Sequence, residues 1–184
     1  MTAIAGPLHL ISRSGTRDLY NTTDSISSGD CYTQASVIAS DPKSLWVVYT
    51  VPNWDHGNSP DSNSATIVEP DGTTVSTMSP IQSAQGFNME NPGAILFEHS
   101  KFRGYGNQHR SHNEDLTSSF SQGTIAGVSS AIITGGVWNL FTGINFTGKR
   151  LVFDGKQDLG PGRYDFGCLP ANDQAKSIKY VRPA

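Results

Sequence analysis

Four side chains that could bind a transition metal lie close together in the segment NQHRSHNED. They are His109, His112, Glu114 and Asp115. Two histidines three positions apart with a carboxylate nearby are ligand types that zinc and related metals take. A solvated polar loop has the same composition and is the simpler explanation. We therefore interpret this segment as a surface loop.

The two cysteines, Cys31 and Cys168, are the other candidates for chemistry. A catalytic thiol needs a positioned histidine and a lowered pKa, and the sequence identifies neither. The cysteines fall in different halves of the chain, so we expect no disulfide framework, and two reduced thiols are typical of a cytosolic protein. Nucleophile-elbow, phosphate-loop and zinc-ligand spacings are missing. We expect no catalytic residues and predict that the protein is not an enzyme.

The composition is that of a turn-rich β protein. Of the 184 residues, 36% are hydrophobic and 16% are charged, and the net charge is −3. This balance and the lack of a basic stripe give no electrostatic reason to expect a nucleic-acid partner. No apolar run is long enough for a membrane span. The start, MTAIAGPLHLI, lacks a charged n-region and a proper apolar core, which predicts no secretory signal and a cytoplasmic location.

Short runs of β-branched and aromatic residues, bounded by Gly, Asn, Asp or Pro, predict an all-β architecture. The runs are Leu8–Ser12, Ala35–Ala39, Leu45–Val51, Ala65–Glu69, Ala94–Glu98, Ala131–Thr134, Val137–Phe141, Arg150–Phe153 and Ser177–Val181. Helical periodicity is absent beyond one turn near Asn113–Phe120, and GRYDFG at Gly162–Gly167 is interpreted as a hairpin turn. The spacing of the runs is that of a β-sandwich.

One aromatic pattern occurs repeatedly at fixed distances. Trp46, Tyr49 and Trp54 recur 92 positions later as Trp138, Phe141 and Phe146, and Phe97, Phe102 and Gly104 recur 44 positions later as Phe141, Phe146 and Gly148. Such periods indicate a repeated supersecondary unit. We predict two domains, residues 1–90 and 91–184, joined at the strand-stopping segment Asn88–Gly93.

The spacing Phe-x4-Phe-x-Gly has a mechanical explanation. Two aromatic residues five apart, with a glycine two later, suit a strand that folds back into a hairpin. One ring covers the turn, the other packs beside it, and the glycine adopts a backbone angle that other residues avoid. Recurrence of the same spacing argues against ordinary core aromatics.

On these residues the chain resembles the βγ-crystallin superfamily. Its Greek-key motif carries an aromatic-x4-aromatic-x-Gly hairpin that is tied down by a serine some thirty residues later. Both halves of residues 94–182 fit this pattern, with Ser129-Ser130 in the first half and Ser177 in the second. The resemblance implies two Greek-key β-sandwich domains, each made of two motifs.

The N-terminal domain resembles a degenerate copy. The segment LWVVYTVPNWDHG keeps the aromatic residues, but Gly57 comes one position late. The opening motif, LHLISRSGTRDLY, has no aromatic residue at the first signature position. We interpret CYTQASVIA as its closing segment, with Ser36 as the tie. The segment after Gly72 looks short for a full motif.

The resemblance also implies Ca²⁺ sites, because many members bind two ions per domain. Each site takes a hydroxyl and a carbonyl from one loop and an acidic side chain from a loop that crosses it. One site of the second domain would use the Gly127 carbonyl, the Ser129 hydroxyl, the Thr142 carbonyl and the Asp173 carboxylate, with Asn172 beside it. A single carboxylate predicts weak affinity, in the range of about 10⁻⁴–10⁻³ M.

The other site of that domain looks disabled. It would contain Glu98 and Gln174, with Ala126 in place of an acid and Lys176 in place of a hydroxyl. The Lys176 ammonium would repel a cation or take its place. The corresponding loop of the first domain, CYTQAS, has no acid, so we expect no site there. A plain turn at Asn172-Asp173 and a capping role for Ser129 are the alternatives to Ca²⁺ binding.

The sequence leaves the role open between two classes. One is a non-enzymatic structural or stress-protective protein with weak Ca²⁺ binding and a hydrophobic interface between its domains. The other is a recognition module that binds carbohydrate, membrane or protein and uses the fold as a scaffold. Long polar loops are the sole feature that would suit a hydrolase or protease inhibitor.

Overall fold

The computed structural model describes residues 7–23, 25–27, 31–37, 43–55, 64–89, 92–118, 127–153, 155–167 and 172–184. The chain divides into two compact units, Met1–Met89 and Glu90–Ala184. Each unit contains two motifs of consecutive β segments. Motifs 1 and 2 cover residues 8–37 and 44–88, and motifs 3 and 4 cover residues 93–135 and 137–182.

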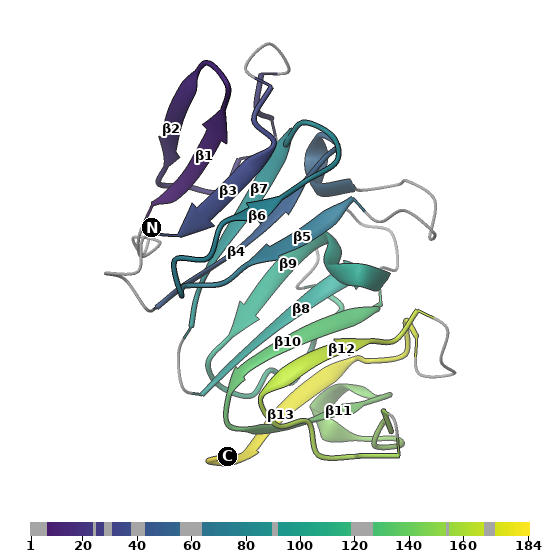
Figure 1. Ribbon diagram of the computed structural model, residues 1–184. Coiled ribbons are helices and arrows are strands. Elements are labelled where there is room, and N and C mark those ends of the chain that lie inside the picture. Colours follow the sequence, from purple (N-terminus) through teal and green to yellow (C-terminus); the bar gives the residue numbers. More distant parts are fainter. Residues whose placement is uncertain are drawn as a thin grey trace. The chain divides into compact units, whose positions relative to one another are not determined.

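Two antiparallel sheets form the second unit, and its motifs exchange a segment between them (Figure 1). The first sheet has the order β12-β10-β8-β9. Its strands are β8 (Gly93–His99), β9 (Arg103–His109), β10 (Ser130–Gly135) and β12 (Gly162–Asp165). The second sheet pairs β11 (Val137–Phe141) with β13 (Ser177–Arg182), and isolated bridges join Phe141 to Arg150 and Asn113 to Ile178. Strand β12 of motif 4 thus belongs to the sheet of motif 3. In exchange, Asn113 of motif 3 bridges to Ile178 in the sheet of motif 4.

The first unit has the same topology (Figure 1). One sheet has the order β2-β1-β3-β6, and the other has the order β5-β4-β7 with a bridge from Thr23 to Ala84. The strands are β1 (Leu8–Ser12), β2 (Gly15–Leu19), β3 (Gln34–Val37), β4 (Ser44–Tyr49), β5 (Ala65–Val68), β6 (Val75–Ser76) and β7 (Ser83–Asn88). Motif 2 is therefore complete, with a third strand of two residues after Gly72.

The all-β prediction is confirmed, and most of the predicted runs form strands. Five strands that the sequence did not indicate are β2, β6, β7, β9 and β12. Gly162–Gly167 is therefore not a hairpin turn, because Gly162–Asp165 pairs with β10. Residues 113–118 contain no helical turn, and 119–120 lie outside the described residues. Arg150 and Phe153 take part in isolated bridges instead of a continuous strand.

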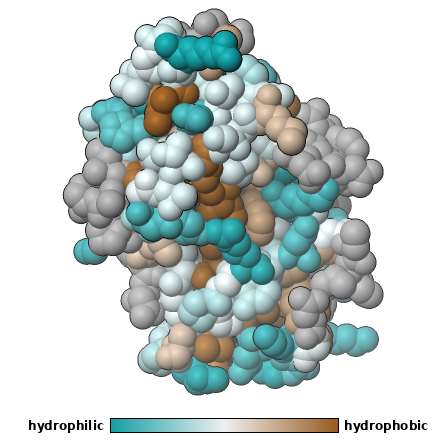
Figure 2. Space-filling model, in the orientation of Figure 1, coloured by the Kyte–Doolittle hydropathy of each residue, from teal (hydrophilic) through white to brown (hydrophobic). Residues whose placement is uncertain are grey.

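Each unit has its own hydrophobic core, centred on one of the two equivalent tryptophans. Trp46 and Trp138 are both fully buried. Trp46 packs with β1, β3 and β7 residues, and Trp138 packs with residues such as Leu96, Leu140 and Ile178. On the face drawn in Figure 2, hydrophilic and near-neutral residues cover most of the described surface. The described part of the chain contains no helix with the length and apolar character that crossing a membrane requires.

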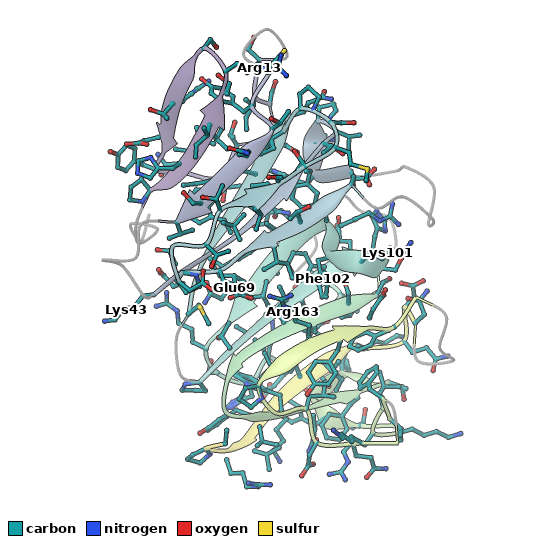
Figure 3. All side chains as sticks on the ribbon, viewed as in Figure 1. Arg13, Lys43, Glu69, Lys101, Phe102 and Arg163 are labelled. Carbon is teal, nitrogen blue, oxygen red and sulfur yellow. The ribbon has the colours of Figure 1, made fainter. Side chains whose placement is uncertain are left out.

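The Phe-x4-Phe-x-Gly segments form folded hairpins, as their spacing predicts. Lys101 and Phe102, labelled in Figure 3, have φ angles of 58° and 60°, and Gly104 follows with 74°. Asn145, Phe146 and Gly148 repeat these values in motif 4, with 54°, 59° and 76°. The rings of each hairpin meet edge to face, with centroids 5.8 Å apart in motif 3 and 6.0 Å apart in motif 4. An aromatic pair of this kind adds about 0.5–1.5 kcal/mol beyond area burial.

A serine hydroxyl bridges two backbone groups of each folded hairpin, and we call this arrangement the serine clasp. In motif 3, Phe102 N donates to Ser130 Oγ (2.9 Å), which donates to His99 O (2.6 Å). In motif 4, Phe146 N donates to Ser177 Oγ (3.1 Å), which donates to Gly143 O (2.7 Å). Of the two serines proposed for motif 3, Ser130 is therefore the tie.

Motif 2 carries the same clasp, which the sequence did not reveal. Trp54 N donates to Ser83 Oγ (3.1 Å), and Ser83 Oγ donates to Val51 O (2.8 Å). Asn53 and Trp54 adopt φ angles of 54° and 53°, so the backbone also matches that of the other hairpins. Gly57, the glycine that comes one position late, lies outside the described residues.

Motif 1 closes its hairpin in a different way. Its strands are joined by a tight turn in which Ser12 Oγ accepts from Ser14 N (3.2 Å) and donates to Gly15 O (3.1 Å). Ser36, the predicted tie, pairs in register with His9, the second residue of β1 and distant from the turn. Ser36 is thus too far along the strand to clasp the turn.

We predict that Ser177→Ala lowers the free energy of unfolding by about 1–3 kcal/mol. The substitution leaves Phe146 N and Gly143 O without their partner in a half-buried turn, and an unmade hydrogen bond has a cost of that size. Urea denaturation followed by circular dichroism measures the change.

Ser36→Ala is the matched control, because it removes the same hydroxyl from a motif without a clasp. We expect its effect to stay within about 0.5 kcal/mol. Equal losses in the two variants would contradict the clasp as the source of stability.

Candidate metal centre

Two loops of the second unit cross in close contact. Residues 127–130 lead into β10, and residues 172–177 lead into β13. A Cβ atom at Gly127 would lie 2.0 Å from Asp173 Cα, so the crossing requires glycine there. Asp173 N approaches Val128 O at 3.3 Å. Asp173 has a φ of 59°, a left-handed conformation that Asp tolerates better than most residues.

Three oxygen atoms from three segments meet at this crossing. Ser129 Oγ lies 2.8 Å from Glu98 O and 2.8 Å from Asp173 Oδ1. Backbone bonds hold Ser129 in place, because its N–H donates to Phe97 O (3.0 Å) and its carbonyl accepts from Phe166 N (2.8 Å). A hydroxyl, a carbonyl and a carboxylate therefore share one small space.

One hydroxyl hydrogen faces two acceptor groups at this point. A serine hydroxyl has one hydrogen to donate, while Glu98 O and the Asp173 carboxylate are both acceptors. The hydroxyl can therefore satisfy fully just one of its two close neighbours. Ca²⁺ is bound by this mixture of carboxylate, hydroxyl and carbonyl oxygens.

Asn172 adds another oxygen near the crossing. Its Nδ2 donates to Asp173 Oδ2 (2.8 Å), which fixes the orientation of the carboxylate. Its Oδ1 is buried and has no hydrogen-bond partner among the described residues. An amide oxygen in this condition is available to a cation or to a water molecule.

The structure places a carbonyl beside Ser129 that the predicted set does not contain. The carbonyl beside the Ser129 hydroxyl belongs to Glu98, whereas Thr142 lies in the hairpin of motif 4. Thr142 N donates to Lys149 O (3.0 Å), and Thr142 Oγ1 accepts from Lys149 N (2.9 Å). The signal that could have found Glu98 is its position directly after Phe97, in the same motif as Ser129.

The residues of the predicted disabled site lie in different motifs. The Glu98 carboxylate accepts from Tyr105 N (2.9 Å) inside the hairpin of motif 3. Lys176 is exposed, and its backbone N–H donates to Phe141 O (2.8 Å) in motif 4. Gln174 is also exposed, and Ala126 lies outside the described residues.

In motif 1, the residue equivalent to Ser129 lies two positions earlier than a tie at Ser36 implies, since that tie would put Ala35 at the hydroxyl position. Thr33 N donates to Ile11 O (3.2 Å), and Thr33 O accepts from Thr77 N (2.8 Å), which repeats the backbone pattern of Ser129. Thr33, and not Ala35, therefore occupies the hydroxyl position. The shift brings Asp30 into the loop, and Asp30 lies outside the described residues.

The segment NQHRSHNED forms no metal centre in the described structure. No group of three or more His, Cys, Asp or Glu side chains gathers there or elsewhere among the described residues. His109 is buried at the end of β9, whereas the exposed His112 ring packs edge to face on Phe146 at 5.7 Å. Cys31 is an exposed thiol, and Cys168 lies outside the described residues.

Comparison with known proteins identifies the fold. The sequence matches no protein-family model and no curated protein. Among solved structures, Geodin, a βγ-crystallin from Geodia cydonium, matches with a TM-score of 0.76 and 21% identity over 96% of this chain and 99% of that chain. The chain therefore has the two-domain βγ-crystallin fold, as the sequence resemblance implies.

Two further structures match more weakly. A βγ-crystallin from Ciona intestinalis has a TM-score of 0.40 and 27% identity over 48% of this chain and 99% of that chain. The solution structure of protein S complexed with calcium has a TM-score of 0.37 and 14% identity over 96% of this chain and 99% of that chain. The assignment of the fold rests on Geodin and not on these two structures.

We predict that His109 makes stability depend on pH. Burial lowers the pKa of His109 from 6.5 to about 4. Below about pH 6.5 the unfolded chain binds a proton that the folded protein does not, so stability falls as the pH drops from 6.5 towards 4. The loss is at most about 3 kcal/mol.

Urea denaturation between pH 4.5 and 7.5 measures this dependence. His109→Phe should flatten the curve, whereas His112→Gln, at an exposed position, should leave it unchanged. A curve for His109→Phe as steep as that of the unmodified protein would contradict the prediction.

Proposed function

We propose that this chain is a non-catalytic protein of structural or protective type whose second unit binds one Ca²⁺ ion weakly. The ion would lie between the Ser129 hydroxyl, the Glu98 carbonyl and the Asp173 carboxylate. The observation that supports this most is the 2.8 Å approach of Ser129 Oγ to both other oxygens.

The donor set suits Ca²⁺ better than other common metals. All three atoms are oxygens, whereas zinc and copper sites are built largely from imidazole and thiolate ligands. The Asn172 amide oxygen and the Gly127 carbonyl can supply further contacts, and water would complete the six to eight ligands that Ca²⁺ takes. The flexible coordination of Ca²⁺ also tolerates a site that is only partly formed by the protein.

Weak affinity follows from the charge of the site. A single carboxylate, Asp173, provides its negative charge, and this side chain is exposed. Sites of this kind have dissociation constants of about 10⁻⁴–10⁻³ M. At about 10 mM Ca²⁺ such binding stabilises the folded protein by about 1.4–2.7 kcal/mol. Ca²⁺ would therefore act on stability, and it would need millimolar concentrations to do so.

The structural or protective role is supported by the hydrophobic cores of the two units. Each has a complete core around its own tryptophan, and most large apolar side chains are buried. The fold alone does not determine a function, so this role is tested through stability and ion response. The exposed thiol of Cys31 suits a reducing, cytosolic compartment.

We predict that Ca²⁺ raises the melting temperature of the second unit through Asp173. At about 10 mM CaCl₂ the rise relative to a chelator should be roughly 5–20 °C, which corresponds to the stabilisation above for a unit of this size. Isothermal calorimetry should detect one site. Asp173→Asn keeps the shape of the side chain and removes its charge, so both responses should disappear.

Asp115→Asn is the matched control, because it makes the same change at an exposed position of the same unit. It should retain the calorimetric signal and the thermal shift. An unchanged Ca²⁺ response in Asp173→Asn would reject the site, and so would the lack of any response in the unmodified protein.

A further inference from the structure

Three residues occupy equivalent positions in motifs 2, 3 and 4, namely Gln82, Ser129 and Lys176. The backbone N–H of each donates to the backbone carbonyl of the first aromatic residue of the same motif. The acceptors are Tyr49 O (2.8 Å), Phe97 O (3.0 Å) and Phe141 O (2.8 Å). Their carbonyls also accept equivalent bonds, from Ile26 N (2.6 Å), Phe166 N (2.8 Å) and Leu116 N (2.8 Å). The clasp serine follows directly in each case, as Ser83, Ser130 and Ser177.

The side chains at this position have different chemistry. Ser129 presents a hydroxyl to the carbonyl of Glu98, the residue after the first aromatic ring. Gln82 presents a carboxamide to the carbonyl of Thr50, which follows Tyr49 in the same way. Gln82 Nε2 lies 2.7 Å from Thr50 O and donates a hydrogen bond to it.

We propose that Gln82 is an intramolecular ligand whose amide nitrogen fills the cation position of motif 2. The partial positive charge of its N–H group faces the Thr50 carbonyl, where a bound ion would otherwise lie. In motif 2 a neutral side chain thus occupies the position beside the Thr50 carbonyl, and no ion is needed there. This inference rests on the proposed function, because the cation position of motif 2 is defined by its equivalence to Ser129, while the contacts of Gln82 are observed independently.

The orientation of the amide follows from its partner. A carboxamide has one donor end and one acceptor end, and the two are assigned from the surrounding hydrogen bonds. Thr50 O is an acceptor, so the nitrogen must face it; the opposite orientation would bring two acceptors within 2.7 Å of each other. Backbone bonds on both sides of Gln82 hold the side chain at this carbonyl.

The test replaces the donor by an acceptor of the same shape. Gln82→Glu puts a carboxylate against the Thr50 carbonyl. Both groups are hydrogen-bond acceptors and repel each other unless a proton or a cation lies between them. The substitution is made in Asp173→Asn protein, so that any Ca²⁺ response comes from position 82. In chelator, we expect the melting temperature of the first unit to fall by on the order of 5 °C.

Addition of about 10 mM CaCl₂ should then recover at least half of the loss, whereas the Asp173→Asn parent should not respond. Hydrogen exchange of the peptide that contains Tyr49–Asp55 should slow with Ca²⁺ in the Glu variant alone. Gln34→Glu is the matched control, since it makes the same change at an exposed position of the same unit. It should show neither the loss nor the recovery.

Gln82→Met provides a second, uncharged variant of similar length. It removes the donor without adding an acceptor, so it should melt below the parent and show no response to Ca²⁺. The proposal is overturned if Gln82→Met has the same melting temperature as the parent. It is also overturned if Gln82→Glu and Gln34→Glu show the same melting temperatures in chelator and in Ca²⁺. If the Glu variant folds in Ca²⁺ but not in chelator, the proposal is supported; if it folds in neither, the Met variant decides.

Discussion

The hydrogen-bonded bridge from one serine to a folded hairpin is the interaction on which each clasped motif depends. The turn places two successive non-glycine residues in the left-handed region, as with Lys101 and Phe102. Each such residue costs about 1–2 kcal/mol. The clasp serine compensates by forming hydrogen bonds with a backbone N–H and a backbone carbonyl of the turn, and the edge-to-face rings add to this. Without the serine, an extended hairpin would be the less strained alternative.

The candidate cation position is a direct consequence of this arrangement. Adjacent residues on a strand point to opposite sides, so Ser130 faces the hairpin turn while Ser129 faces the carbonyl of Glu98. The clasp fixes the hairpin, the hairpin fixes that carbonyl, and the crossing loop then brings Asp173 to the same point. Strand exchange between the two motifs provides the crossing. A site of three oxygens therefore arises from contacts whose first effect is to hold the fold together.

The sequence could predict the hairpins because their signal is local. The rings and the glycine lie within eight residues, and the geometry requires that spacing at Phe97–Gly104 and again at Phe141–Gly148. It could not indicate β9 or β12, because RGYGNQH and GRYD have little β propensity and form strands through their pairing with β8 and β10. The resemblance grouped Ser129 with Asp173, which the structure brings into contact, but it paired them with the Thr142 carbonyl, whereas the carbonyl beside the Ser129 hydroxyl belongs to Glu98. A backbone carbonyl is present at every residue, so only the register of the folded chain can select Glu98.

The separation between fold and ion binding follows from motifs 2, 3 and 4. Gln82, Ser129 and Lys176 make the same backbone bonds, although one side chain is neutral, one is a hydroxyl and one is positively charged. The backbone of the motif therefore tolerates all three, and the fold does not require a cation at this position. The side chain decides only what lies against the neighbouring carbonyl: an amide hydrogen at Thr50, or a shared hydroxyl at Glu98. Because each unit has its own hydrophobic core, a cation held at Ser129 as proposed would adjust the stability of one unit without controlling whether the chain folds.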